Sequence, residues 1–183
     1  MRPQRAPIFI GGEGQSEVGY AGWLRNLVRD RDLPFHLELC DLGRGAGDPF
    51  TRMDMAFERL TRMEKNREPF VGRFLFLDTD QLAGDRTRAE QARRRALEHK
   101  LTVIWQEPTH EAFLLRHFPG REMRRPPDKR SADGALAREW DDYRKPSSAQ
   151  KLEQRLDLDG ARRVADRLPE LADLLRMIGL LER

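Results

Sequence analysis

The stretch "FLFLDTD" (residues 74–80) decides the fold class, because a continuous apolar run ends there in two carboxylates. An apolar run without alternation is typical of a strand covered on both faces, and therefore of a central strand in a parallel sheet. Ligands of open parallel sheets gather at the carboxyl ends of the strands. Asp78 and Asp80 follow this run at period-two spacing, so we expect both side chains to face the same side.

Outward from this strand, apolar periodicity alternates between the strand and the helix type. The predicted elements are, in chain order, a strand at 8–10, a helix at 16–30, an alternating strand at 35–42, a helix from 48, the strand at 74–80, an arginine-rich helix at 85–100, a strand at 101–106 and a helix from 109. On the helix from 48, Phe50, Met53, Phe57 and Leu60 form the predicted apolar stripe. This order predicts an α/β fold with a mainly parallel sheet flanked by helices.

After residue 120 the sequence becomes polar, basic and rich in helix breakers. We expect a loop there, then a short helix at 135–143 and a leucine-rich helical end that stops at Gly179. The predicted organisation is an α/β catalytic domain at 1–122, followed by a basic loop and a helical C-terminal extension at 123–183.

Composition limits the classes of function. Cys40 is the only cysteine, which excludes an intramolecular disulfide and a zinc ribbon and fits a reducing cytoplasm. A net charge of +3 and a pI near 9.3 mildly favour an acidic partner such as nucleic acid, although a soluble arginine-rich protein fits equally well. No segment resembles a signal peptide or approaches the roughly 20 apolar residues of a membrane span. We therefore expect a cytoplasmic protein that does not enter the membrane.

The glycine-rich turn at 11–17 follows the first predicted strand but does not fit a nucleotide-binding loop. Glu17 occupies the third position of a dinucleotide fingerprint, and no lysine completes a P-loop. Glu13 instead joins Asp78 and Asp80 at the strand ends, where three carboxylates repel each other unless a cation lies between them. Oxygen ligands of this kind suit Mg²⁺ or Mn²⁺. The alternative is a set of solvated strand ends.

Three stretches together carry a family resemblance, and "YRKP" (143–146) is a weaker match. They are "EGQSEVGY" (13–20), "FLDTD" (76–80) and "EPTHEAFLLRHF" (107–118). In order and spacing they resemble the RloB/AbiLii-like family of phage-defence proteins, which have the Toprim fold and are related to OLD-type Toprim nucleases. The chain departs from the family pattern at Glu107 and at Thr109-His110.

The resemblance implies metal-dependent cleavage of phosphodiesters. Glu13, Asp78 and Asp80 would hold a first ion and Glu111 would help to hold a second, as in two-metal hydrolysis. Lys145 would neutralise charge on the scissile phosphate. The residues themselves leave two alternatives: Glu111 as a first-turn glutamate that favours the helix dipole, and Lys145 as a solvated loop lysine.

For further residues the sequence gives weaker evidence of a functional role. Glu17 is either a first-turn helix glutamate or a ligand or support of the metal site, and His117 is either a packed helix histidine or a catalytic base. A basic segment follows the motif helix and is either a phosphate-binding surface or a solvated charge run. Its members are Arg121, Arg124, Arg125, Lys129 and Arg130.

Taken with the predicted metal site, the resemblance implies a magnesium-dependent nuclease of DNA or RNA in phage defence. The resemblance implies a partner ATPase encoded nearby, because AbiLii- and OLD-type systems pair these modules. The chain shows no ATP-binding motif, so any control by ATP is expected to come from that partner. A homo-oligomer stays an open alternative to a monomer. One rival function is a non-catalytic Toprim-like sensor or scaffold subunit, and another is a small-molecule phosphotransferase or nucleotide-binding protein.

Overall fold

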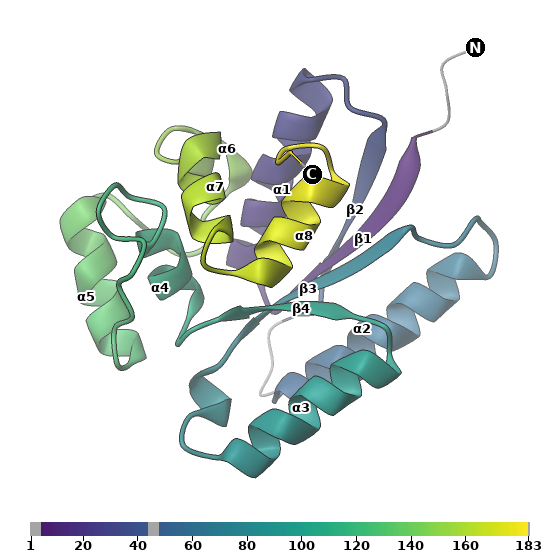
Figure 1. Cartoon of the computed structure of the whole chain (residues 1–183), viewed down its shortest axis with the longest axis horizontal. Coiled ribbons are helices and arrows are strands. Elements are labelled where there is room, and N and C mark those ends of the chain that lie inside the picture. The colour runs from purple at the N-terminus through teal and green to yellow at the C-terminus, as the bar shows by residue number, and fades with distance from the viewer. Residues whose placement is uncertain (1–4, 44–47, 183) are drawn as a thin grey trace.

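The computed structural model describes residues 5–43 and 48–182, and within them it forms a four-stranded parallel sheet (Figure 1). The strand order is β2-β1-β3-β4. The strands are β1 (Ala6–Gly12), β2 (Phe35–Asp41), β3 (Gly72–Asp78) and β4 (Thr102–Gln106). The predicted α/β class is confirmed, and the apolar run that suggested a central strand lies in β3, between β1 and β4.

Helices cover both faces of the sheet, as Figure 1 shows. One face carries α2 (Pro49–Glu64) and α3 (Arg86–Glu98), which pack on β3 and β4. The other face carries α1 (Gln15–Asp30) and α8 (Pro169–Met177). The remaining helices are η1 (Asp80–Leu82), α4 (His110–Leu115), α5 (Lys129–Glu139), α6 (Ala149–Glu153) and α7 (Leu158–Ala165).

The alternation of side chains along the strands divides the core into two layers. Phe74 and Phe76 of β3 pack in the layer of α1, whereas Leu75 and Leu77 pack in the layer of α2 and α3. The C-terminal helices join the α1 layer, to which they contribute Trp140 and several leucines. Side chains from both sides of the predicted boundary at residue 122 therefore share one core. None of the helices within the described ranges has the length and apolarity needed to cross a membrane.

The C-terminal helices begin at other residues than predicted. The Asp128 carboxylate accepts a hydrogen bond from the Ser131 amide at 2.8 Å and caps α5, which therefore starts at Lys129 rather than at 135. Arg130 thus lies in a first helical turn and not in a loop. The predicted leucine-rich helical end is two helices, α7 and α8, because Pro169 starts the second one.

The buried stripe of α2 also differs from the predicted one. Phe57 is 36% exposed and stacks on His99, whereas Arg52, Met53 and Ala56 lie on the buried face. The apolar periodicity alone did not indicate that a cation shares this face.

The loop between α5 and α6 lies directly on the backbone of α1. A Cβ atom at Gly19 would lie 1.9 Å from the carbonyl oxygen of Ser147, which is far inside contact distance. Only glycine at position 19 allows this approach. The same loop carries Lys145, so the contact also determines where that ammonium group lies.

We predict that Gly19→Ala lowers the free energy of unfolding by about 1 to 3 kcal/mol, because the new methyl group pushes the 145–148 loop off α1. Gly134 in α5 is the matched control, since a Cβ atom added there would meet no other atom within 4 Å. Gly134→Ala should raise the free energy of unfolding by about 0.5 to 1 kcal/mol through helix propensity. Urea denaturation measures both, and equal stability of the two variants would contradict the close contact.

Candidate functional site

A cavity of about 400 Å³ opens at the carboxyl edge of the sheet, where β1 and β3 end. Its walls combine acidic and basic side chains. The carboxylates are Glu13, Glu17, Asp78 and Glu111, and the nitrogen-bearing groups are Arg52, His110, Lys129 and Lys145. Three of the four carboxylates expected to share a metal site, together with Glu17, therefore line one cavity.

Glu13 and Asp78 are joined directly. The Asp78 backbone amide donates a hydrogen bond of 3.1 Å to Oε2 of Glu13. Burial, with the nearby charges of Glu17, Glu13 and Glu111, raises the pKa of Asp78 to about 9, and Oδ1 of Asp78 is buried with no hydrogen-bond partner. Burial also raises the pKa of Glu13. A carboxylate at Asp78 therefore needs a cation that the described side chains do not supply to it.

Glu17 combines both of its predicted roles. Its Oε2 accepts a hydrogen bond of 3.0 Å from the Gly14 amide, which closes a capping box at the start of α1. Its Oε1 lies 3.8 Å from Nδ1 of His110 in the cavity. The side chain is 7% exposed. The same residue thus fixes the helix start and adds negative charge to the site.

Glu111 is almost fully buried and is the one carboxylate of the cavity with a lysine partner among the described residues. Oε1 accepts hydrogen bonds from Lys145 Nζ at 2.6 Å and from the Tyr143 hydroxyl at 3.0 Å. Burial opposes ionisation of Glu111, but Lys145, His110 and Tyr143 together hold its pKa below the ordinary value. Oε2 is buried without a partner. Lys145 is therefore not simply a solvated loop lysine.

Asp80 lies outside the cavity, contrary to the expectation that it faces the same side as Asp78. The strand ends at Asp78 and Thr79 adopts a helical backbone, so the period-two alternation stops. Asp80 then begins η1 and is exposed. Its negative charge still contributes to the raised pKa of Asp78.

His117 belongs to the core rather than to the cavity. Its Nε2 pairs with the Tyr20 hydroxyl at 2.9 Å, and its Nδ1 with the Phe113 carbonyl at 3.0 Å. Burial lowers the pKa of His117 to about 3, so the imidazole is neutral at pH 7. These contacts match the packed helix histidine and leave no nitrogen directed to the site.

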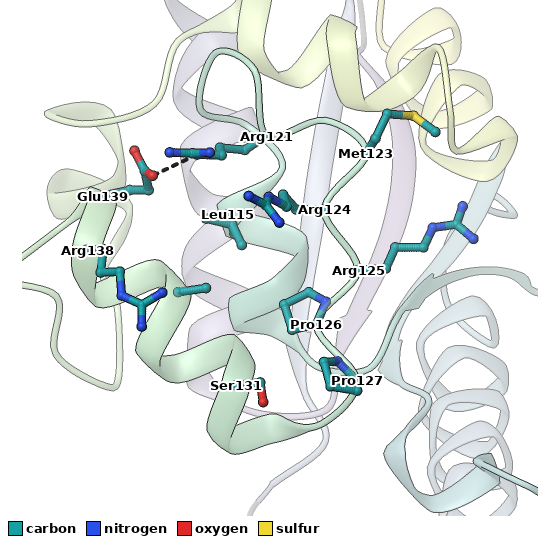
Figure 2. A pocket seen from close by; sticks show the side chains of 11 residues that line it. Leu115, Arg121, Met123, Arg124, Arg125, Pro126, Pro127, Ser131, Arg138 and Glu139 are labelled. Carbon is teal, nitrogen blue, oxygen red and sulfur yellow. Dashed lines mark hydrogen bonds and ion pairs between the residues drawn. The ribbon is translucent and has the colours of Figure 1, made fainter.

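The predicted basic segment is divided among four places. Arg121 pairs with Glu139 at 2.7 Å, and Figure 2 shows Arg121 and Arg124 along the groove between the loop and α5. Arg125 projects to the other side of the loop, where it pairs with Glu107 at 3.5 Å. Lys129 lines the carboxylate cavity instead. Arg130, in the first turn of α5, is exposed.

Sequence reasoning missed three residues of the site. Arg52 is buried, donates to the Leu42 carbonyl at 2.9 Å and favours ionised Glu13 through its charge. His110 is buried with Nδ1 2.8 Å from Nε2 of Gln106, and its own Nε2 has no partner. Tyr143 bonds Glu111. The apolar pattern of α2 gave no signal for Arg52, whereas the "YRKP" stretch was the signal for Tyr143.

The donor chemistry of the cavity fits Mg²⁺ or Mn²⁺. Hard divalent cations prefer carboxylate oxygens, and two buried oxygens, Asp78 Oδ1 and Glu111 Oε2, lack a partner. As the side chains stand, no three His, Cys, Asp or Glu residues within 5–43 and 48–182 are placed to hold a metal ion. No protein-family model, curated protein or solved structure matches the chain.

We predict that the metal-free protein becomes less stable as pH rises between about 5 and 9. Asp78 has an ordinary pKa of 3.8 and a folded-state pKa of about 9, so the folded state keeps a proton that the unfolded state has lost. The stabilisation that this proton gives to the folded state is complete below pH 3.8 and disappears as pH rises through 9. The slope from this one proton is at most about 1.4 kcal/mol per pH unit.

Chemical denaturation in EDTA at several pH values measures this slope. Asp78→Asn should reduce it, leaving the smaller part due to Glu13, and should exceed the wild type in stability at pH 8. Exposed Asp166→Asn is the control and should leave the slope unchanged. If the stability of Asp78→Asn falls with pH as steeply as that of the wild type, Asp78 ionises freely in the folded protein.

Proposed function

We propose that the protein is a magnesium- or manganese-dependent nuclease that hydrolyses phosphodiester bonds of DNA or RNA in phage defence. The observation that carries the proposal is Asp78, a partly buried residue whose Oδ1 is buried without a hydrogen-bond partner and which lines a cavity with three further carboxylates. Such a group stays protonated at neutral pH unless a cation joins it. Lysines at the rim of the same cavity suit an anionic substrate.

The residues divide into two roles in this proposal. Glu13 and Asp78 would hold the ion, and Glu111 and Glu17, which line the same cavity, would contribute oxygens to it or to a second ion. A divalent ion supplies stabilisation of negative charge on the reacting phosphate and a water of lowered pKa. Asp80 adds negative charge from outside the cavity.

Lys145 and Lys129 would bind the phosphate oxygens of the substrate. Lys145 is 45% exposed although it pairs with Glu111, so one side of its ammonium group faces solvent. Lys129, in the first turn of α5, is exposed as well and lines the same cavity. Arg52 is buried, lines the same cavity and favours an ionised Glu13.

The rival function is a non-catalytic sensor or scaffold subunit. One observation favours it: the ammonium group of Lys145 lies 2.6 Å from Glu111 and already neutralises this carboxylate. In that case Lys145 replaces a second ion, and the site is a structural ion pair. Asp78 argues for the nuclease, since no described cation neutralises it.

The biological setting rests on the family resemblance alone. It supports a cytoplasmic location, a partner ATPase encoded nearby and a role in abortive infection. A homo-oligomer is compatible with the same resemblance.

We predict that calorimetry detects Mg²⁺ or Mn²⁺ binding that Asp78→Ala abolishes and Glu13→Gln weakens. Cleavage of DNA or RNA, by the protein alone or with its ATPase partner, should stop in EDTA and fall by about a hundredfold or more in Asp78→Ala. Asp80→Asn should lose less cleavage activity than Asp78→Ala, because the Asp80 side chain is exposed outside the cavity. Glu90→Gln, which changes an exposed carboxylate on α3, is the matched control for charge.

Two results would contradict the proposal. One is that Asp78→Ala binds the metal ion as tightly as the wild type does. The other is an assembly, reconstituted with its partner, that restricts phage equally well with and without the Asp78 carboxylate. The second result would assign the chain to the scaffold function.

A further inference from the structure

A second cleft, of about 470 Å³, lies beside the carboxylate cavity at the same edge of the sheet. Thr79 lines this cleft and directly follows Asp78, which lines the cavity. The two hollows are therefore neighbours across one strand end. The far wall of the cleft is the loop with Pro126 and Pro127, whose other side faces the groove in Figure 2.

Four arginines line the cleft from four different parts of the chain. They are Arg93 of α3, Arg116 after α4, Arg125 of the loop and Arg167 after α7. Two carboxylates, Glu107 and Glu170, also line it, so the positive charge exceeds the negative charge. In the part of the chain that the structure describes, no ion pair involves Arg93, Arg116 or Arg167.

The positive charge of Arg116 lies at a buried position of the cleft. Its side chain is 4% exposed, and its Nε donates to the Glu122 carbonyl at 3.0 Å. Burial and the like charge of Arg125 lower its pKa. Arg125 pairs with Glu107 at 3.5 Å, whereas Arg116 has no ion pair among the described residues, and an anion in the cleft would neutralise it.

The cleft also has a flat apolar wall. Trp105 of β4 lines it together with Leu82 and Ala89. Trp105 is partly exposed, whereas Trp23 and Trp140 are 1% and 2% exposed. An aromatic face beside arginines is the combination that binds single-stranded nucleic acids, by base stacking together with phosphate contacts.

We propose that this cleft binds one nucleotide of a single-stranded nucleic acid, with its phosphate on the arginines and its base against Trp105. The inference deepens the proposed nuclease function and rests on it for the identity of the ligand. The strand would continue past Thr79 into the carboxylate cavity. Four arginines and one indole thus hold the strand, while the cavity acts on a neighbouring phosphate.

Fluorescence anisotropy with labelled oligo(dT) and, in a second arm, oligo(U) tests the proposal in EDTA, so that neither metal binding nor cleavage contributes. The test variant is Arg93→Ala with Arg167→Ala, both exposed positions of the cleft. The control is Arg94→Ala with Arg176→Ala, which removes the same charge from exposed positions outside the cleft.

The test variant should bind about tenfold more weakly than the control, and its plot of log K against log[salt] should be flatter by about 1.4 for two lost phosphate contacts. Binding should also quench tryptophan fluorescence, because Trp105 is the indole open to a base, and Trp105→Ala should weaken binding further than Trp105→Phe. Tighter binding of oligo(dT) in both variants identifies DNA as the ligand, and tighter binding of oligo(U) identifies RNA.

Equal affinity and equal salt slope in the test variant and the control would overturn the proposal, as would binding without any change in tryptophan fluorescence. Such a result leaves metal binding and cleavage at Asp78 intact, so the nuclease proposal would stand without this subsite. Conversely, cleft-dependent binding together with wild-type metal affinity in Asp78→Ala would retain the subsite and reject the nuclease.

Discussion

The hydrogen bond from the Asp78 amide to the Glu13 carboxylate joins the ends of β1 and β3, and the site depends on it. Parallel pairing aligns Gly12 with Phe76, and the Glu13 amide donates to the Phe76 carbonyl, so Glu13 has little freedom to turn away. The sheet thereby holds two carboxyl groups together despite their repulsion. The backbone amide favours an ionised Glu13, whereas Asp78 receives no such compensation. This imbalance is what makes a cation the natural complement of the cavity.

The C-terminal segment supplies the positive side of the same cavity. Lys129 comes from the first turn of α5 and Lys145 from the loop that lies on α1 at Gly19. Both positions depend on the packing of Trp140 and its neighbours into the core layer of α1. A domain that ended near residue 122 would keep the carboxylates but lose both lysines. The extension is therefore part of the site rather than an addition to it.

Apolar patterns predicted the sheet, because buried parallel strands such as β3 leave continuous apolar runs in the sequence. They also placed Glu13 and Asp78 at one edge. Asp80 was misplaced because alternation holds only while the strand lasts, and the chain turns at Thr79. Lys129 was assigned to a loop because the cap at Asp128 starts α5 earlier than its apolar residues indicate. Side-chain pairs between distant segments, such as Lys145 with Glu111, depend on tertiary packing and leave no local pattern.

The two hollows at this edge of the sheet differ in their balance of charge. In one hollow Asp78 has no ion-pair partner among the described residues, and in the next the arginines outnumber the carboxylates. Thr79 and Pro108, joined by a backbone hydrogen bond of 3.1 Å, line the second hollow where it adjoins the first. If the two hollows merged, their side chains would pair with each other and neither would retain affinity for a ligand. If the proposed function holds, the arginine cleft would attract a polyanion that the carboxylate cavity alone would repel. The proposal then implies that the metal-free protein would hold a nucleic acid without acting on it, and that cation binding would decide when the two hollows act together.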